Sequence, residues 1–322
     1  MKKSLIMIIS IIFLFSILTG CSNDSSSNSE TQKQNLEKLV VTYVTSPLNV
    51  PSIVEKEKQI FNEAFKDAGT TIEYAEITSG AEQTQALASG DVQILYGVGA
   101  TSVILSAANG ADIKVLNMYS RSPEAFTMYT KDKNITSPEN LRGKTIAGPV
   151  GTNLHELLVS YLATANMTID DVNYVNMSIP DAKAALDGGS IDVALLAGAT
   201  AHTAKTQGYH MVTNGQDLID AIIVVAVTNK FYQENKDVID TFIKAQEKIA
   251  TFIEQNTDEA MSIVAKTLDL DEMAVREMYI LYNFSTDVTE LDIAGFQKTA
   301  DFMLESGMIE NPVDVKSLFL NQ

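Results

Sequence analysis

The sequence predicts an α/β fold in which two similar lobes are followed by a helical tail. Between about residues 39 and 230, short runs of apolar and β-branched residues alternate with segments of helical periodicity. This alternation begins again near residue 126, so the chain contains two α/β halves. Alternating strands and helices are typical of largely parallel sheets covered by helices, and the chain is long enough for two lobes of ordinary size.

In the first half, the predicted strands are 39–44, 71–77, 92–96 and 113–119, and the predicted helices are 51–68, 81–89 and 100–109. Pro51 lies in the first turn of the first helix, a position that suits proline. Gly69, Gly90 and Gly110 each follow a predicted helix, and glycine favours the position just after a helix. These signals therefore set the expected helix boundaries.

In the second half, the predicted strands are 126–129, 144–147, 173–176, 191–197, 209–212 and 221–227, and the predicted helices are 152–165, 181–186 and 199–207. The run 221–227 is apolar throughout, as is typical of a strand buried on both faces. Residues 239–253 then carry apolar side chains on one face of a long helix. Further helices are expected over 257–267, 271–282 and 290–306.

The N-terminus has the pattern of an export signal. Lys2 and Lys3 precede an apolar run from Leu5 to Leu18, which would span roughly 21 Å as a helix, less than the ~30 Å hydrocarbon core of a bilayer. The run ends in Leu18-Thr19-Gly20-Cys21, which resembles the lipobox of bacterial lipoproteins. The resemblance implies a signal peptide over 1–20, lipid attached to Cys21, a flexible tether over 21–35, and anchoring to the cell membrane on its extracytoplasmic face.

The composition argues against several classes of function. The formal net charge is −18, which argues against nucleic acid as a partner and against flat electrostatic binding to anionic lipid. The charge does not exclude a local anion site, because backbone N–H groups can line a cleft. Cys21 is the only cysteine, so the chain can form neither an internal disulfide nor a cysteine metal cluster.

Several segments resemble one family in their order and spacing. They are Ser79-Gly80, Gln85-Ala86-Leu87-Ala88-Ser89-Gly90-Asp91-Val92, Leu141-Arg142-Gly143-Lys144-Thr145-Ile146-Ala147, Gly151-Thr152, Ile169-Asp170-Asp171-Val172, and Ala184-Ala185-Leu186-Asp187-Gly188-Gly189-Ser190-Ile191-Asp192-Val193. Together they resemble the nitrate/sulfonate/taurine-type periplasmic binding proteins over most of residues 39–230.

This resemblance implies a type II periplasmic binding protein fold, with two α/β lobes joined by a hinge of two crossings. Lobe 1 would comprise 36–124 and 226–322, lobe 2 would comprise 130–219, and the crossings would lie near 125–129 and 222–228. The implied function is that of a binding component of an ABC importer, which captures a small molecule between the lobes and delivers it to the permease and ATPase. A monomer without a cofactor is expected, and enzyme activity is not.

The expected ligand site lies where strands end and helices begin. Ligands of open α/β sheets bind beyond the carboxyl ends of the strands, where free N–H groups and positive helix ends can point into the cleft. The residues expected there are Ser46, Pro47, Leu48, Ser79, Gly80, Gly99, Ala100, Tyr119, Arg121, Gly151, Thr152, Asn153, His155, Thr200 and His202. Each Ser, Thr or Asn could instead cap its own helix. The turn Gly151-Thr152-Asn153 is the expected centre, because it combines a hydroxyl, two N–H groups and a glycine that permits close approach.

Few charged residues are available to define the ligand. Of the three arginines, only Arg121 falls at a predicted cleft end, where it could bind a sulfonate or carboxylate or could be a solvated loop residue. The family often has an aromatic and an acidic residue where this chain has Gly198-Ala199-Thr200-Ala201-His202, which puts an ordinary sulfonate or pyrimidine ligand in doubt. A sulfonate- or taurine-like anion is still favoured. A neutral nitrogen heterocycle, such as a thiamine-pyrimidine precursor, is the alternative.

The histidines and the remaining motifs leave other readings open. His155 and His202 fall in the first turns of predicted cleft helices and could donate to a ligand oxygen, but no metal site is expected because further ligands are lacking. A lipoprotein that senses a ligand for a membrane receptor would share every feature above. Thiamine-pyrimidine synthases look similar but carry a cysteine-rich motif, and this chain shows no such motif, P-loop or zinc motif.

Overall fold

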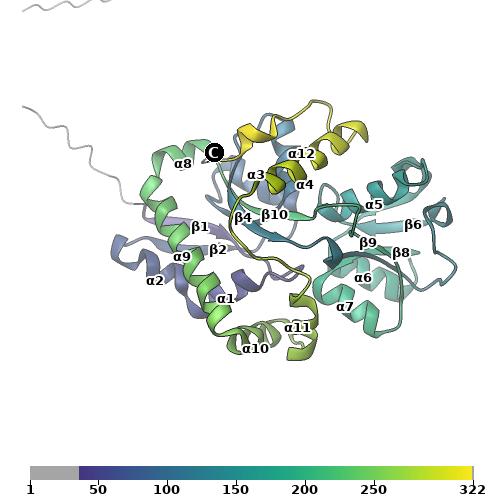
Figure 1. Ribbon diagram of the computed structural model, residues 1–322, viewed down its shortest axis with the longest axis horizontal. Coiled ribbons are helices and arrows are strands. Elements are labelled where there is room, and N and C mark those ends of the chain that lie inside the picture. Colours follow the sequence, from purple (N-terminus) through teal and green to yellow (C-terminus); the bar gives the residue numbers. More distant parts are fainter. Residues whose placement is uncertain (1–35, 321–322) are drawn as a thin grey trace, which may run out of the picture. The chain divides into compact units, whose positions relative to one another are not determined.

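Residues 36–320 are described by a computed structural model, so the expected signal peptide, lipidated Cys21 and tether lie outside the described residues. The described residues confirm the predicted fold class, because they form two α/β lobes, each built on its own sheet with helices on both faces (Figure 1). The chain passes from lobe 1 to lobe 2 and back again, so two crossings join the lobes.

Lobe 1 contains the first four strands and the last one. They are β1 (Lys38–Thr42), β2 (Thr71–Ala75), β3 (Leu95–Gly99), β4 (Lys114–Arg121) and β10 (Ile222–Val227). β1 and β2 pair in parallel, and a parallel bridge between Val41 and Ile94 joins β1 to the segment that leads into β3. β10 lies between β3 and β4 and runs antiparallel to both. The expected largely parallel sheet thus includes one antiparallel strand.

Lobe 2 repeats this arrangement. Its strands are β5 (Phe126–Thr130), β6 (Thr145–Gly148), β7 (Asn173–Asn176), β8 (Val193–Ala197) and β9 (His210–Asn214). They lie in the order β7-β6-β8-β5-β9, where β6 is parallel to β7 and β8 and β5 is antiparallel to its two neighbours. In each lobe the antiparallel strand is therefore the one that the chain forms directly after a crossing.

The helices cover the sheets and fill the C-terminal region. Lobe 1 has α1 (Val50–Lys58), α2 (Ile60–Phe65), α3 (Gly80–Ser89), α4 (Ala100–Ala108), α8 (Asn229–Glu234), α9 (Lys236–Gln255), α10 (Thr257–Leu268), α11 (Glu272–Tyr279) and α12 (Glu290–Glu305). Lobe 2 has α5 (Asn153–Ala163), α6 (Ile179–Gly188) and α7 (Gly198–Thr206). The predicted amphipathic face of α9 is confirmed, since Ile239, Phe242, Ile249 and Ile253 are buried there.

Several boundaries differ from the sequence-based expectations; for example, the strand predicted over 92–96 is β3 at Leu95–Gly99. Two of the differences change the description of lobe 1. The predicted helix 51–68 is interrupted at Gln59, whose left-handed φ of 55° separates α1 from α2. The second crossing does not lie in 222–228, because β10 pairs with β4 along its whole length, from Ile222 opposite Arg121 to Val227 opposite Lys114. The crossings are instead 122–125, between β4 and β5, and 215–221, between β9 and β10. Lobe 1 therefore resumes at residue 222 and not at 226.

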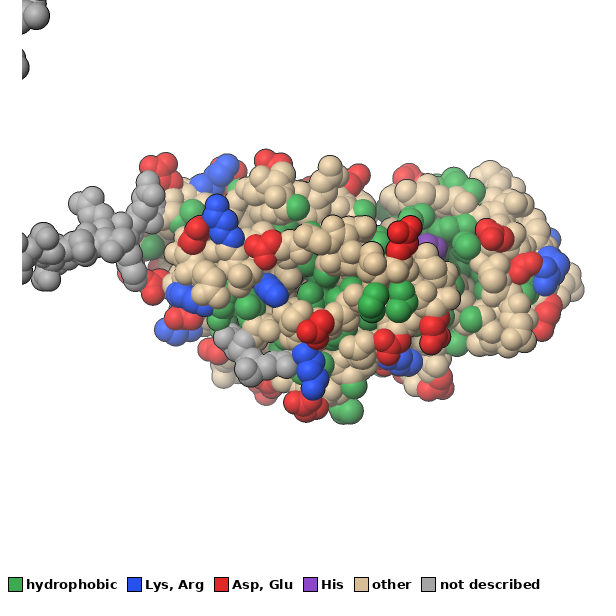
Figure 2. Space-filling view, turned by 90° about the horizontal axis from the view of Figure 1, so that it is seen from above, with side chains coloured by type: hydrophobic (Ala, Val, Ile, Leu, Met, Phe, Trp, Pro, Cys, Tyr) green, Lys and Arg blue, Asp and Glu red, His purple; other side chains and the backbone are tan. Residues whose placement is uncertain are grey.

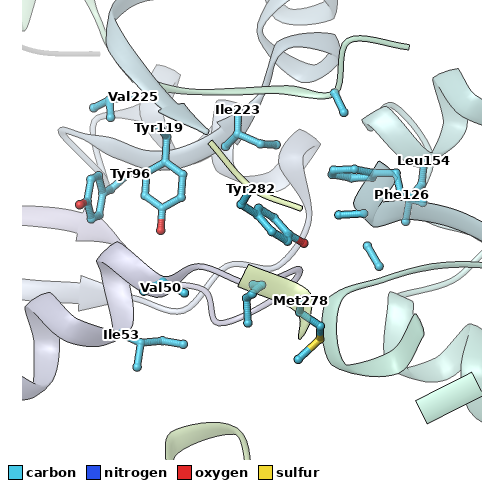
Figure 3. Packing of buried hydrophobic residues seen from close by; sticks show 14 of the residues in the cluster. Val50, Ile53, Tyr96, Tyr119, Phe126, Leu154, Ile223, Val225, Met278 and Tyr282 are labelled. Carbon is cyan, nitrogen blue, oxygen red and sulfur yellow. The ribbon is translucent and has the colours of Figure 1, made fainter. Parts of the chain in front are cut away.

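The apolar core continues from one lobe into the other. A single cluster of buried residues joins Tyr96, Tyr119 and Ile223 of lobe 1 to Phe126 and Leu154 of lobe 2 (Figure 3). The strand β10 is buried at every position, as its continuous apolar sequence predicts. The two lobes therefore share one apolar core beside the crossings. The polar contacts between the lobes begin at the edge of this core.

Candidate functional site

Four helices begin at uncapped ends directly after a strand or the loop that follows it. Their N-cap residues are Asn49 of α1, Gly99 of α4, Thr152 of α5 and Ala197 of α7, and none of these makes a side-chain cap hydrogen bond. By contrast, side chains cap the helices α3, α6, α8, α11 and α12. The other uncapped helices, α2, α9 and α10, each follow directly on a preceding helix. In α1, however, Pro51 has no N–H and the N–H of Ser52 donates to the hydroxyl of Tyr119 at 3.3 Å. The helix starts that can offer backbone N–H groups are therefore those of α4, α5 and α7.

The starts of α4 and α5 meet across this boundary. Ser102 Oγ donates to the carbonyl oxygen of Gly151 at 2.7 Å, and Thr101 Oγ1 donates to Asn153 Oδ1 at 2.9 Å. Asn153 Nδ2 in turn donates to the carbonyl oxygen of Ile222 at 3.2 Å. Asn153 is only 2% exposed, so a side chain of lobe 2 is inserted between two segments of lobe 1. The lobes are therefore in contact at this point, directly beside the second crossing.

The start of α7 meets lobe 1 at a second point. A Cβ atom added to Gly198 would lie 1.5 Å from the carbonyl oxygen of Pro47 and 2.3 Å from its carbonyl carbon. Gly198 also has a φ of 56°, a conformation that side chains rarely adopt. Only glycine therefore lets the start of α7 approach the 45–49 loop this closely.

A buried carboxyl group lies beside the α4–α5 contact. Glu156 of α5 is 4% exposed, and its two oxygens accept from Thr101 Oγ1 of α4 and Thr299 Oγ1 of α12, both at 2.9 Å. Burial raises the pKa of Glu156 to about 7, and nearby Asp220 acts in the same direction, while the threonine hydrogen bonds and Lys298 oppose the rise. Thr101 has one hydroxyl proton but lies 2.9 Å from both Asn153 Oδ1 and Glu156 Oε2. Both contacts are satisfied when Glu156 is protonated and donates to Thr101.

Three of the expected ligand-binding residues lie away from the boundary contacts. Arg121 donates to Asp292 Oδ2 at 2.7 Å and to the carbonyl oxygens of Ser285 and Asp287, so its guanidinium is occupied within lobe 1. Tyr119 is buried, and its hydroxyl lies 2.8 Å from Ser52 Oγ. Leu48 is fully buried in the core. The solvated-loop reading of Arg121 is also wrong, because an ion pair holds this residue in place.

Thr152 and His155 both make hydrogen bonds within the turn that begins α5. Thr152 Oγ1 donates to the carbonyl oxygen of Pro149 at 2.8 Å, so this hydroxyl closes the turn and does not cap the helix. His155 Nδ1 accepts from the N–H of Gly151 at 3.3 Å, and its ring stacks on Tyr174. Burial lowers the pKa of His155, so the ring stays neutral. His155 therefore stabilises the turn by this hydrogen bond, and Tyr174 holds its ring in place.

The structure places the other expected residues at strand or helix ends. Ser79 caps α3 by accepting from the N–H of Glu82, while Gly80 packs against Ser102. Gly99 packs against Asn153, and Ala100 is buried in the first turn of α4. Ser46 and Pro47 are half-buried in the loop that contacts Gly198, Thr200 donates to the carbonyl oxygen of Ala197, and His202 lines a pocket between α7 and α11. Of the expected set, the boundary contacts bring together Pro47, Gly99, Gly151 and Asn153, while the contact of Gly80 with Ser102 lies within lobe 1.

Sequence reasoning missed the residues that bridge the lobes. Ser102, Glu156 and Thr299 make these contacts but were not expected at the cleft, whereas Thr101 and Gly198 fall within the predicted strand ends without an assigned role. A signal existed for Gly198, because a glycine directly after a buried strand and before a helix suggests close backbone approach. No local pattern predicts that Thr299 reaches Glu156, because the two residues lie far apart in the sequence.

The surface agrees with the acidic composition. In the view from above, acidic side chains are scattered over the face and many basic ones lie beside them (Figure 2). Within residues 36–320, no helix is both long and apolar enough to cross a membrane. In the same part of the chain, no group of three or more His, Cys, Asp or Glu side chains is arranged to hold a metal ion.

Two α/β lobes that close over uncapped helix ends define a type II periplasmic binding protein. The chain belongs to the NMT1/THI5-like family, whose model matches residues 51–260. It is 26% identical to a protein named for binding aliphatic sulfonates in Bacillus subtilis (strain 168), over 100% of this chain and 95% of the relative. It is 29% identical to the taurine-binding periplasmic protein of Escherichia coli (strain K12), over 59% of this chain and 60% of the relative.

A solved structure shows the same fold. The alkanesulfonate-binding protein SsuA from Xanthomonas axonopodis pv. citri, bound to MOPS, superposes with a TM-score of 0.80 at 18% identity, covering 89% of this chain and 99% of that chain. All three of these proteins are named as binding proteins. The comparisons therefore support a solute-binding role.

Proposed function

We propose that this protein is the solute-binding lipoprotein of an ABC importer and that it captures a small sulfonated solute between its lobes. The uncapped starts of α4, α5 and α7 carry the proposal, because free N–H groups and positive helix ends stabilise an anionic head group without an arginine. The names of the relatives that bind sulfonates and taurine point to the same ligand class.

A neutral ligand is the second candidate. All three arginines form ion pairs with carboxylates: Arg121 with Asp292, Arg142 with Asp171, and Arg276 with Asp258. None of them is therefore free to neutralise a sulfonate, and a neutral nitrogen heterocycle would need no such partner. Titration of the protein with taurine, ethanesulfonate and a neutral pyrimidine separates the two candidates, since one class should bind and the other should not.

We expect Thr152→Ala to weaken ethanesulfonate binding by roughly threefold to tenfold, because loss of one hydrogen bond of ~0.5–1.5 kcal/mol loosens the α5 turn. The matched control is Ser178→Ala, which removes the side-chain cap of α6. The control should lower the melting temperature by about 2–4 °C and leave the affinity unchanged. Calorimetric titration beside thermal unfolding measures both quantities. Equal affinities in the wild type and Thr152→Ala would move the centre of the site away from α5.

The proposed membrane anchor has its own test. We expect the wild-type protein to fractionate with membranes and Cys21→Ala to remain unprocessed or to appear in the soluble fraction, because diacylglycerol on this cysteine supplies two acyl chains. Fractionation followed by mass spectrometry of the N-terminus measures the outcome. A wholly soluble wild-type protein with an unmodified N-terminus beyond residue 21 would contradict the anchor.

A further inference from the structure

A pocket of about 340 Å³ lies between the lobes on the side of α7 and α11. Lobe 2 contributes Ala201 and His202 of α7 and Met211 of β9, while lobe 1 contributes Met278 of α11 and the turn that follows it. Its volume falls in the range of small-molecule pockets. Because both lobes form its walls, the pocket exists only while the lobes are together.

Tyr282 lines this pocket, and no group within residues 36–320 satisfies its hydroxyl. Its hydroxyl is buried and has no hydrogen-bond partner among the described residues. The ring stacks on Phe284 with centroids 5.4 Å apart, and Figure 3 shows the oxygen on the side that faces lobe 2. Burial raises the pKa of Tyr282 well above its ordinary value, so the hydroxyl keeps its proton and is available as a donor. Buried hydroxyls normally have a partner, so the missing acceptor points to a ligand.

The rest of the lining is suited to an uncharged group. Ala125, Ala201, Met211, Met278 and Leu281 form the apolar part of the wall. Three charged side chains line the pocket, and all are exposed to solvent: Glu124, Lys205 and Glu277. Lys205 and Glu277 lie 4.0 Å apart and pair with each other. A charged ligand group would have to compete with this pair, whereas an apolar group would be removed from water.

We propose that this pocket binds the uncharged aromatic or branched apolar part of the captured solute and that Tyr282 donates a hydrogen bond to an acceptor on it. The inference rests on the proposed function, because the head group of the same molecule would occupy the helix ends. Gly198 connects the two regions, since it begins α7 and also lines the pocket. The solute class is therefore an aryl or branched-alkyl sulfonate with a carbonyl or ether oxygen at the far end.

Three sulfonate probes test the inference: ethanesulfonate, 4-isopropylbenzenesulfonate and 4-acetylbenzenesulfonate, titrated calorimetrically into the full-length protein in detergent. Both aryl probes should bind at least about tenfold tighter than ethanesulfonate, because each buries a ring in the pocket. Tyr282→Phe should weaken the acetyl probe by roughly threefold to tenfold and leave the isopropyl probe unchanged, because only the acetyl group accepts a hydrogen bond. The matched control is Tyr161→Phe on α5, outside the pocket, which should change none of the affinities.

The outcomes separate this inference from the proposed function. If ethanesulfonate binds and the aryl probes bind no tighter, the pocket inference is overturned and the proposed function stands. If the aryl probes bind tighter but Tyr282→Phe weakens both equally, the donor role of Tyr282 is overturned. If none of the three sulfonates binds, the proposed ligand class is wrong and the pocket inference is overturned with it.

Discussion

Gly198→Ala is expected to prevent full closure of the lobes and to weaken ethanesulfonate binding by about 100-fold. The new Cβ would lie 1.5 Å from the Pro47 carbonyl oxygen, which is a backbone atom and cannot turn aside as a flexible side chain could. The left-handed φ of Gly198 adds strain for any other residue. Overpacking of this kind costs about 1–3 kcal/mol, and each ~1.4 kcal/mol is a factor of ten in affinity. Separation of the 45–49 loop from α7 is the simplest way to relieve the clash.

The control for this prediction is Gly188→Ala at the end of α6 in the same lobe. A Cβ at Gly188 would meet nothing within 4 Å, so neither affinity nor stability should fall. Calorimetric titration measures the affinity, and small-angle scattering measures whether the variant is more open than the wild type. Wild-type affinity in Gly198→Ala would show that the α7 contact plays no part in binding.

The second large effect concerns pH. Affinity for ethanesulfonate should fall about tenfold between pH 6 and pH 8, because the closed lobes hold Glu156 in its protonated form. The closed-state pKa of about 7 lies above the ordinary value of 4.5, so closure takes up a proton in this range. The stabilisation is complete below pH 4.5 and is lost as the pH rises through about 7. Sulfonates themselves do not titrate here.

The charged groups around Glu156 do not reverse the direction of its pKa shift. Asp220 of the second crossing raises the pKa of Glu156, and Lys298 of α12 lowers it but is also paired with Asp220 at 3.5 Å. Asp301 and Glu305 of α12 line the same pocket as Glu156 and carry no positive charge that would lower its pKa. Thr101 of α4 contributes a hydroxyl and no charge. The balance therefore favours the neutral acid in the closed form.

Two variants isolate this contribution. Glu156→Gln should keep the affinity and remove the pH dependence, because a glutamine amide can donate to Thr101 and accept from Thr299 as the protonated acid does. The control is Glu55→Gln, since burial also raises the pKa of Glu55 to about 7 but its partners, Phe61 and Tyr74, lie within lobe 1. Glu55→Gln should alter the pH dependence of the free energy of unfolding without changing the pH dependence of the affinity. An unchanged pH profile in Glu156→Gln would rule out the carboxyl group as the cause.

The helices and strands of this fold are well predicted from the sequence where a single residue, such as a glycine, marks the boundary of an element. Gly90 and Gly189 end their helices in the left-handed conformation, as glycine allows and as the sequence suggests. The break at Gln59 could not be predicted, because no glycine or proline marks it. The second crossing was misplaced because an apolar strand looks the same whichever lobe buries it.

The candidate site was predictable only in part. Strand ends and helix starts predict a region that remains a candidate site, and the α5 turn lies against α4 within it. Arg121 was misassigned because its partner, Asp292, is distant in sequence and no local pattern pairs them. The same limit applies to Thr299 with Glu156 and to Pro47 with Gly198. Contacts between lobes depend on tertiary packing, and periodicity carries no information about them.

The placement of β10 also sets an order of assembly. Lobe 2 is continuous in sequence from β5 to β9, so every strand of its sheet is present once residue 214 has been made. Lobe 1 must wait for β10, which joins β3 to β4, before its own sheet is complete. Because chains emerge N-terminus first, lobe 2 can reach its native structure while the earlier-made lobe 1 is still open between β3 and β4. The last strand to be added thus completes the lobe that was begun first, and it joins residues 36–121 to residues 222–320 in one lobe.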